Sequence, residues 1–303
     1  MKLSILTATY NRAEFLEKLY NSIIENLDSG LDAEWLIMDD GSTDETSKVV
    51  QKFIDENKLE IKYKFQENQG KMAAINNLMP FTTGDLIVDC DSDDYFAQDS
   101  FKTIKETLEQ TNPEGLYGIC FLKQNENGKI DGISFKNETS TMFELYFKEA
   151  ATGEKGLVYY AEIRKNYKHE LEENEKFITE ARMYHKMDEK YKIKCINKPI
   201  TIGDYQENGY TSNILKTFTE SPKGYLKYFE EILQKDFKGV QLNKRLYAIK
   251  HYILFLTITN QKLNLRQVKN ILNKILILVL YIPGKIKSKK FLKAWFFSQA
   301  SIE

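Results

Sequence analysis

Residues 84–94 read Gly84-Asp85-Leu86-Ile87-Val88-Asp89-Cys90-Asp91-Ser92-Asp93-Asp94. The apolar residues Leu86, Ile87 and Val88 between short polar flanks predict a buried strand. Four aspartates follow within six residues, and such a density of carboxylates is unfavourable unless a cation or hydrogen bonds compensate the charge. Carboxylate oxygens suit Mg2+ or Mn2+, which are commonly held by one or two carboxylates together with substrate phosphates. The alternative is a solvated acidic turn that caps the next helix.

The chain before this stretch alternates between apolar strands and amphipathic helices. The spacing of apolar residues predicts strands at residues 3–8, 35–38 and 61–65, and helices at residues 13–26, 44–56 and 70–79. This alternation predicts an α/β fold with a mostly parallel sheet and helices on both of its faces.

Polar clusters follow three of the predicted strands, at Thr9–Arg12, Asp39–Ser42 and Asp89–Asp94. In parallel sheets, ligands bind outside the carboxyl ends of the strands, so these clusters are expected to meet at one edge. The alternative, three unrelated loops with ordinary turn residues, does not account for their shared position. No Gly-x-Gly-x-x-Gly follows the first strand and no Gly-Lys-Ser/Thr loop occurs, so the sequence does not support a standard dinucleotide site or a P-loop nucleotide site.

The composition indicates a globular protein in a reducing compartment. The 303 residues, 42% of them hydrophobic, suffice for one large domain or a domain with an appendage. The odd number and wide spacing of Cys90, Cys120 and Cys195 fit neither a disulfide framework nor a zinc site, which favours a cytoplasmic setting. Residues 1–7 lack the long apolar region of a signal peptide and are expected to begin the first strand.

The charges are distributed unevenly along the chain. No acidic residue lies between Asp236 and Glu303, although the chain contains 44 in total. The same interval contains thirteen basic residues: Lys238, Lys244, Arg245, Lys250, Lys262, Arg266, Lys269, Lys274, Lys285, Lys287, Lys289, Lys290 and Lys293. Such asymmetry indicates two regions with different roles.

Four motifs occur in a familiar order and spacing. They are Thr7-Ala8-Thr9-Tyr10-Asn11-Arg12, Met38-Asp39-Asp40-Gly41-Ser42-Thr43-Asp44, Glu67-Asn68-Gln69-Gly70-Lys71 and the segment from Gly84 to Asp94. Together they resemble the family 2 glycosyltransferases, which have the GT-A fold, a Rossmann-like, mostly parallel sheet flanked by helices. The resemblance implies a catalytic domain over residues 1–215, with a nucleotide-sugar half at 1–110 and an acceptor half at 111–215. Residues 216–303 would form a basic, mainly helical C-terminal region.

Members of this family move a sugar from a nucleotide diphosphate sugar to an acceptor hydroxyl. The resemblance therefore implies a metal-dependent inverting enzyme of the hexosyl- or N-acetylhexosaminyltransferase type, with UDP or dTDP as the favoured nucleotide and Mn2+ or Mg2+ as the cofactor. The acceptor would be a saccharide or a lipid-linked saccharide, in the assembly of cell-surface polysaccharide or glycolipid.

The resemblance also assigns residues to the nucleotide sugar. They are Thr7, Thr9, Tyr10, Arg12, Asp39, Asp40, Asn68, Lys71 and Asp91. Tyr10 would stack on the base, since an aromatic face is a general platform for nucleobases, or else pack on the first helix. Asp40 is the favoured acceptor for the imide N–H of uracil or thymine, with Asp39 as the alternative. Lys71 would lie near the diphosphate, at a helix N-terminus where anions are favoured.

The metal is assigned to Asp93 and Asp91, of which Asp91 is also a candidate for the nucleotide ribose. Alternation along an extended chain would place Asp89, Asp91 and Asp93 on one side. A bound metal would offset charge on the leaving phosphate as a Lewis acid. Asp94 is expected instead to cap a helix predicted at residues 96–108.

Inverting transfer also needs a carboxylate base. The segment 174–184 resembles the family segment that supplies it, which favours Glu180 as the base, with Glu175 as the alternative. Residues 169–190 are rich in Glu and Lys, however, and this composition is also typical of a solvated helix. Residues 204–213 resemble a family loop that closes over the donor or the acceptor.

The C-terminal region combines basic and apolar residues. The apolar run 275–282 ends at Pro283 and is shorter than the roughly 20 residues that span a bilayer. Lysines then alternate with Phe291, Trp295, Phe296 and Phe297, a composition typical of segments that bind an anionic membrane surface. This predicts peripheral attachment at the inner face of the membrane. The alternative is a helical bundle that packs on the acidic catalytic domain, and the aliphatic run argues against nucleic acid as a partner.

Two other functional classes have weaker support in the sequence. A nucleotidyltransferase would need a basic loop early in the chain to hold a triphosphate, and only Arg12 is present there. A catalytically degenerate binding or scaffold protein would be expected to lose its carboxylates, whereas Asp40, Asp91, Asp93 and Glu180 are all present.

Overall fold

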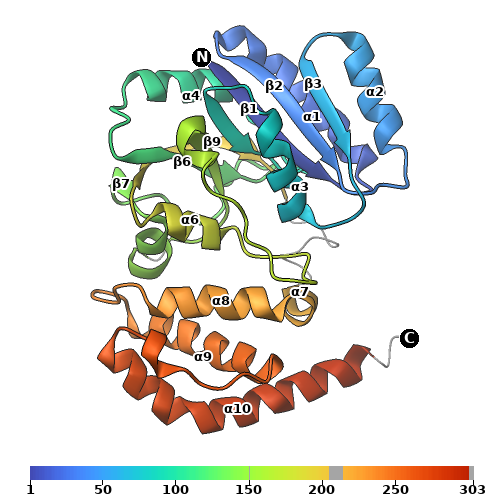
Figure 1. The fold of residues 1–303 in the computed structure, drawn as a ribbon. Helices are drawn as coiled ribbons and strands as arrows, with labels where there is room; N and C mark the ends of the chain where they lie inside the picture. Colours follow the sequence, from blue (N-terminus) through green and yellow to red (C-terminus); the bar gives the residue numbers. More distant parts are fainter. Residues whose placement is uncertain (150, 205–213, 300–303) are drawn as a thin grey trace. The chain divides into compact units, whose positions relative to one another are not determined.

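The computed structural model describes residues 1–149, 151–204 and 214–299, with side chains up to residue 292 (Figure 1). Its centre is a nine-stranded sheet in the order β3-β2-β1-β4-β8-β6-β9-β5, with β7 paired to β9. The strands are β1 Lys2–Thr9, β2 Asp32–Asp39, β3 Glu60–Phe65, β4 Leu86–Asp89, β5 Tyr95–Phe96, β6 Leu116–Gln124, β7 Thr139–Ser140, β8 Lys155–Tyr160 and β9 Lys192–Ile202.

The first half of the sheet confirms the predicted parallel α/β architecture. Strands β3, β2, β1 and β4 are mutually parallel neighbours. Helices α1 (Ala13–Asn26), α2 (Thr46–Glu56) and α3 (Lys71–Leu78) make the connections between successive strands. In Figure 1, α1 and α2 lie on one face of these strands and α3 lies on the other.

Alternation along the strands divides the core into two layers. In β1, Leu3 and Ile5 pack on the α1–α2 side, whereas Leu6 packs on the α3 side. In β2, Trp35 joins the first layer and Leu36 the second. All five side chains are fully buried, as expected for strands that are covered on both faces and therefore read as continuous apolar runs.

The second half of the sheet is mixed. Strand β8 is antiparallel to both β4 and β6, and β6 is parallel to β9 with irregular register. Helix α4 (Ser100–Glu109) packs in the first core layer and α6 (Ala181–Met187) in the second. The remaining helical segments of this part are η1 Leu27–Ser29, η2 Met79–Phe81, the π-helical turn η3 Glu144–Lys148 and α5 Ala161–Arg164.

The chain divides into two compact units. The first comprises Met1–Glu170 and the chain from Glu180 through β9, and the second comprises Leu171–Thr179 and the C-terminal helices. These helices, α7 Ile214–Glu220, α8 Pro222–Leu233, α9 Leu242–Ile258, the short turn η4 Leu265–Gln267 and α10 Ile271–Gln299, confirm the predicted helical C-terminal region.

Aromatic stacking and one buried arginine hold the second unit together. The rings of Tyr225 and Phe255 stack between α8 and α9 with centroids 5.1 Å apart. Arg245 of α9 donates hydrogen bonds to the Val240 carbonyl and to Asn273 of α10, each 3.0 Å long. Helix α10 continues through Pro283, so the apolar run does not end the helix there. None of the helices in the described residues has the length and apolar content that crossing a bilayer requires.

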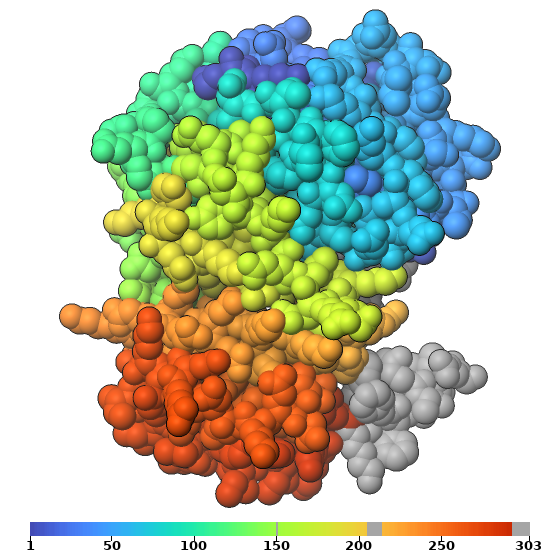
Figure 2. All heavy atoms as spheres, viewed as in Figure 1, coloured from blue at the N-terminus to red at the C-terminus, as the bar shows by residue number. Residues whose placement is uncertain are grey.

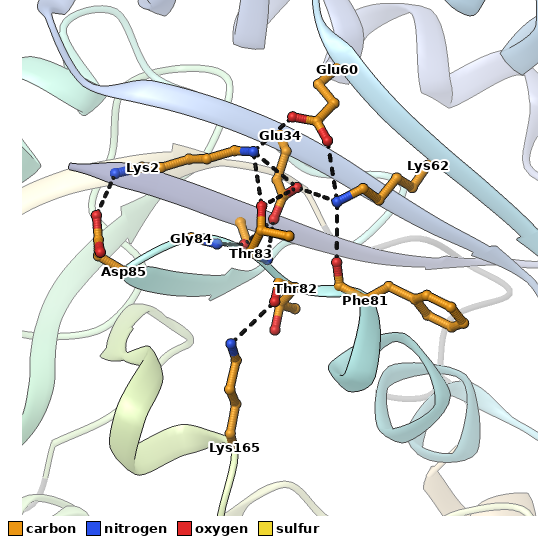
Figure 3. Close-up of polar contacts among 11 residues, drawn as sticks. Lys2, Glu34, Glu60, Lys62, Phe81, Thr82, Thr83, Gly84, Asp85 and Lys165 are labelled. Atoms are coloured by element: carbon orange, nitrogen blue, oxygen red, sulfur yellow. Dashed lines mark hydrogen bonds and ion pairs between the residues drawn. The ribbon is translucent and has the colours of Figure 1, made fainter.

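A buried carboxylate joins the amino ends of the four parallel strands (Figure 3). Glu34, fully buried near the start of β2, accepts hydrogen bonds from the Ser4 hydroxyl of β1 (2.6 Å) and the Thr83 amide that precedes β4 (2.6 Å). It also pairs with Lys62 of β3 at 2.7 Å and with Lys2 of β1 at 3.2 Å. Burial alone would raise the pKa of the Glu34 carboxyl, but these donors outweigh it and lower the pKa to about 2.

Replacement of Glu34 by glutamine should therefore destabilise the protein at neutral pH by roughly 3 kcal/mol, the free energy that corresponds to the lowered pKa. Because the folded-state pKa lies below that of the unfolded chain, this stabilisation is present above about pH 5 and is lost as the pH falls towards 2. Urea unfolding of wild type and Glu34→Gln at pH 7 and at pH 3 measures the difference.

The matched control for this measurement is Glu60→Gln. Glu60 pairs with the same two lysines, but its side chain is 49% exposed, so its loss should change stability by less than about 1 kcal/mol. Equal stabilities of the two variants at pH 7 would contradict the role of Glu34.

Candidate active site

The polar clusters that follow β1, β2 and β4 meet at the carboxyl edge of the parallel strands, as the sequence predicts. Thr9 and Asp39 are register partners, and the Asp40 amide donates to the Thr9 carbonyl over 2.8 Å. On the other side of β1, the Cys90 amide donates to the Leu6 carbonyl over 2.9 Å. This register fixes the relative positions of the three loops.

The loop after β1 is tied to the loop after β2. Asn11, with a positive φ of 51°, accepts a hydrogen bond from the Thr43 amide (2.8 Å), and its own amide donates to the Ser42 hydroxyl (2.9 Å). Asp44 accepts from the Ala13 amide at the start of α1. These cross-connections hold the loop that carries Tyr10, which is 49% exposed at the rim.

The two threonines of the first motif are buried in β1. The Thr7 hydroxyl donates to the Cys90 carbonyl and accepts from the indole N–H of Trp35, each over 3.0 Å. These contacts give Thr7 a structural function that the sequence analysis did not anticipate. The Thr9 hydroxyl is buried without a hydrogen-bond partner among the described residues.

Asp39 and Asp40 are buried and accept hydrogen bonds from their own loop and from neighbouring segments. Asp39 accepts from the Ser42 amide and the Tyr63 hydroxyl, both over 2.6 Å. Asp40 accepts from the amide of Gly70 through Oδ2 over 2.8 Å.

The other oxygen of Asp40 holds the neighbouring loop. Oδ1 of Asp40 accepts from the Gln66 side chain (2.7 Å) and the Gln69 amide (2.8 Å), and Asn68 donates to the Asp40 carbonyl (2.9 Å). Asp40 thereby positions the turn that begins α3 at Lys71. Its Oδ2 accepts a single hydrogen bond among those described, and a carboxylate oxygen has capacity for a second.

One cation links the candidate base to the acidic motif. The ammonium group of Lys71, at the first residue of α3, lies 2.6 Å from Oδ1 of Asp91 and 2.8 Å from Oε1 of Glu180. The other oxygen of Glu180 accepts from the Tyr184 hydroxyl over 2.8 Å. The structure therefore brings together Lys71, Asp91 and Glu180, which the sequence analysis placed in the site from three separate motifs.

Electrostatic interactions within this group keep Lys71 and Glu180 ionised. Burial opposes ionisation of Glu180, but the Lys71 ammonium outweighs it and holds the pKa of this carboxyl well below its usual range. Burial likewise opposes the charge on Lys71, but the two carboxylates raise its pKa. Asp91 remains 44% exposed and Glu180 34% exposed, so both carboxylates are accessible to a ligand.

The acidic motif is a turn rather than an extended strand, which corrects one expectation. Strand β4 ends at Asp89, and the Asp94 amide donates to the Asp91 carbonyl over 3.0 Å. The alternation that would place Asp89, Asp91 and Asp93 on one side therefore stops at the strand end. Asp91 contacts Lys71, whereas Asp93 lies 4.0 Å from the guanidinium of Arg12.

The expectation that Asp94 caps the next helix is wrong. Tyr95–Phe96 forms the short strand β5, and helix α4 begins only at Ser100. The Asp94 carboxylate instead pairs with Lys123 of β6 at 2.8 Å, in a partly desolvated position where burial raises its pKa despite the lysine. A methyl group at Gly203 would clash with this carboxylate, so a larger residue there would require the Asp94 side chain to shift.

A buried layer beneath the site was not predicted. Arg164, fully buried at the end of α5, lies 3.6 Å from Asp89 and 3.4 Å from the imidazole of His169. Burial and the guanidinium lower the pKa of His169 to about 3, so its ring is neutral. His169 is also fastened to α3, because its backbone N–H and C=O pair with the Asn76 side chain. No local pattern in the sequence signals these contacts between distant segments.

Glu175, the alternative base, has a structural position in the second unit. Its carboxylate oxygens accept the backbone amides of Lys223 (2.7 Å) and Gly224 (2.8 Å) in the first turn of α8. These contacts satisfy two amides that have no partner within the helix. The family-like loop at 204–213 falls, after Asp204, outside the described residues.

The oxygen donors at this edge fit a hard divalent cation. Asp91 and Asp93 are two partly exposed carboxylates of the type that holds Mg2+ or Mn2+ together with substrate phosphates. Within the described residues, no group of three or more His, Cys, Asp and Glu side chains is arranged to hold a metal. Oxygens of a bound substrate would therefore have to complete the coordination.

The chain is similar to known glycosyltransferases in sequence and in fold. The family model described as "Glycosyl transferase family 2" matches residues 4–187. An uncharacterized glycosyltransferase of Mycoplasma genitalium is 29% identical over 239 residues, which cover 77% of this chain and 71% of that protein. A Campylobacter jejuni GalNAc(5)-diNAcBac-PP-undecaprenol beta-1,3-glucosyltransferase is 30% identical over 42% of this chain and 40% of its own length.

Solved structures share the fold. Staphylococcus aureus TarS 1-349 in complex with UDP-GlcNAc matches with a TM-score of 0.58 and 19% identity, covering 95% of this chain and 81% of that one. The mannosyltransferase PcManGT of Pyrobaculum calidifontis in complex with GDP-Man and Mn2+ matches with a TM-score of 0.55 and 15% identity, covering 95% and 83% of the two chains. With a family model that spans more than half of its length and a GT-A sheet, the chain belongs to glycosyl transferase family 2.

Proposed function

We propose that this chain is a metal-dependent, inverting glycosyltransferase that uses a nucleotide diphosphate sugar, with UDP or dTDP as the favoured nucleotide. The observation that carries the proposal is the ion-paired group Asp91–Lys71–Glu180 at the carboxyl edge of the parallel strands. It brings the proposed diphosphate-binding cation, Lys71, within ion-pair distance of the proposed metal-binding carboxylate and of the proposed base.

Lys71 and the acidic turn would hold the diphosphate. The Lys71 ammonium stands at the first turn of α3, where backbone amides also favour an anion. Asp93 and Asp91 would hold the metal, which supplies Lewis-acid stabilisation of the leaving phosphate when bound. Binding of the donor would draw Lys71 from its carboxylate partners towards the diphosphate, leaving Asp91 available to the metal.

Glu180 would act as the base that deprotonates the acceptor hydroxyl. Its carboxylate is ionised, as a base requires, and the Tyr184 hydroxyl fixes its orientation. While Lys71 is paired with it, Glu180 is a weak base because its pKa is low. Movement of Lys71 towards the donor would raise that pKa, so the base would gain strength only once the donor is bound.

The nucleotide would lie over the loops after β1 and β2. Tyr10 is exposed at the rim and offers a stacking face for the base. Oδ2 of Asp40 retains acceptor capacity for an imide N–H, which uracil and thymine present and guanine presents with a different neighbouring pattern.

The relatives suggest the class of sugar and acceptor. TarS is named a poly(ribitol-phosphate) beta-N-acetylglucosaminyltransferase, and the C. jejuni relative is named for a glucosyl transfer to an undecaprenol-linked saccharide. By analogy, we infer a hexosyl or N-acetylhexosaminyl donor and a saccharide or lipid-linked saccharide acceptor in cell-surface assembly. An acceptor of this kind would place the enzyme at an anionic membrane surface on the cytoplasmic side.

The donor preference provides the direct test of the proposed function. Calorimetric titration with UDP, dTDP and GDP in the presence of Mn2+ should give the tightest binding for UDP or dTDP. Hydrolysis assays with the corresponding nucleotide sugars should then identify a donor. Tighter binding of GDP than of both other nucleotides would refute the role of Asp40, and failure to bind any of the three would refute the function.

Replacement of Glu180 by glutamine should lower turnover by roughly 100-fold or more, the usual contribution of a general base, while donor binding persists. The matched control is Glu175→Gln, which should leave turnover of the folded protein near wild type but lower the melting temperature, because the cap of α8 weakens. Steady-state kinetics and thermal melting distinguish the two. Normal turnover in Glu180→Gln with loss in Glu175→Gln would transfer the catalytic role to Glu175.

Replacement of Asp93 by asparagine should abolish most activity and weaken the binding of metal together with UDP. The variant should be about as stable as wild type, because the change removes a carboxylate from a crowded acidic turn. Activity assays with added Mn2+ or with chelator, and calorimetry of UDP with and without metal, measure the effect. Full activity in chelator together with a near-normal Asp93→Asn variant would exclude a metal at this position.

A further inference from the structure

Helix α10 is covered on one side and exposes an aliphatic face on the other. On one side, Asn273 and Ile277 are fully buried, and Gly284 lies against Ile253 of α9. The opposite side is exposed, although it is aliphatic. Its residues, with their exposed fractions, are Ile271 70%, Ile275 53%, Leu278 59%, Val279 66%, Ile282 69% and Ile286 54%.

These exposed residues form one continuous stripe. Apart from the adjacent pair Leu278 and Val279, they are spaced three or four residues apart, which places them along one side of a helix over about 24 Å at 1.5 Å per residue. Of the 17 exposed large hydrophobic residues among those described, eight lie on α10, so the exposure is concentrated there rather than scattered. A contiguous exposed apolar surface of this kind marks an interaction site.

The charges around the stripe indicate the kind of partner. Lys285, Lys287, Lys289 and Lys290 follow or border it, and no acidic residue occurs between Asp236 and Glu303. A partner should therefore combine an apolar layer with negative charge, which describes the interface of an anionic bilayer. A second copy of α10 would bring the same positive charges, and their repulsion disfavours pairing of two such helices.

We propose that α10 lies in the plane of an anionic membrane surface, with its aliphatic stripe inserted among the lipids and its lysines at the headgroups. This deepens the proposed function by naming the docking surface. It also moves the expected insertion from Trp295, Phe296 and Phe297, whose side chains lie outside the described ones, to the stripe 271–286. Figure 2 shows side chains of this C-terminal unit (orange to red) at the molecular surface.

The test uses the full chain and two kinds of vesicle. Co-sedimentation is measured with equal parts phosphatidylglycerol and phosphatidylcholine, and with phosphatidylcholine alone, at low and high salt. Wild type should bind the anionic vesicles, and high salt should weaken binding without abolishing it, because ions screen only the lysine contribution. The double variant Leu278→Ser/Ile282→Ser should bind at least tenfold more weakly at both salt concentrations.

Two further variants separate the electrostatic contribution to vesicle binding from the apolar one. Lys285→Gln/Lys289→Gln should weaken binding at low salt but change little at high salt. Leu242→Ser removes an equally exposed apolar residue (58%) that lies on α9 and is not part of the stripe, and should bind like wild type. All replaced side chains are exposed or partly exposed, so each variant should fold. Thermal melting checks this.

Three results would overturn the proposal: no binding of wild type to either vesicle, wild-type binding by the double serine variant, or a dimer in sedimentation velocity that this variant dissociates. The last result would assign the stripe to a second copy. None of these measurements depends on sugar transfer, so vesicle binding and the proposed catalytic function can fail independently. Calorimetry with UDP on the same variants reports the state of the nucleotide site separately.

Discussion

The candidate site depends on the ammonium group of Lys71 between the carboxylates of Asp91 and Glu180. These carboxylates come from the end of the fourth parallel strand and from the start of α6, and without a cation they would repel each other in a partly desolvated position. Lys71 itself is placed by Asp40, which holds the turn before α3 through the Gly70 amide. Asp40, which follows β2, therefore fixes the position of Lys71. Lys71 in turn links the segments that carry Asp91 and Glu180.

The carboxylates at the two ends of the parallel sheet differ in their burial and in how fully their charges are compensated. At the amino end, Glu34 is fully buried and accepts hydrogen bonds from several donors, so its charge is permanently compensated and ties four strands together. At the carboxyl end, Asp91 and Glu180 share one cation and remain partly exposed. A ligand could therefore replace the Lys71 ammonium as the partner of these two carboxylates. Glu34 cannot lose its partners without a loss of stability. The contrast distinguishes a stabilising network from the candidate functional one within a single sheet.

In the C-terminal unit, helix α10 likewise combines a side that stabilises the fold with a side that is exposed. One side of α10 packs on α9 through buried residues such as Ile277, and the other side presents aliphatic residues such as Ile282 to solvent. A helix that needed only to stabilise its own unit would carry polar residues on that outer side. The absence of acidic residues from the same segment gives this surface one sign of charge, so its apolar and electrostatic features favour the same kind of partner.

The sequence alone determined the parallel half of the sheet, because apolar runs and helical periodicity are local signals. It also placed the three polar clusters at one edge, because the direction of each strand follows from the connections between strands. It also located Lys71, Asp91 and Glu180 through motifs. Only the tertiary structure decided that one lysine joins both carboxylates, that Asp94 pairs with Lys123 rather than with a helix end, and that Glu175 caps α8. These contacts join segments far apart in the chain, and residue spacing carries no information about such pairs. The outward stripe of α10 was hidden for the same reason: its periodicity reveals an apolar face, but only packing shows which face remains uncovered.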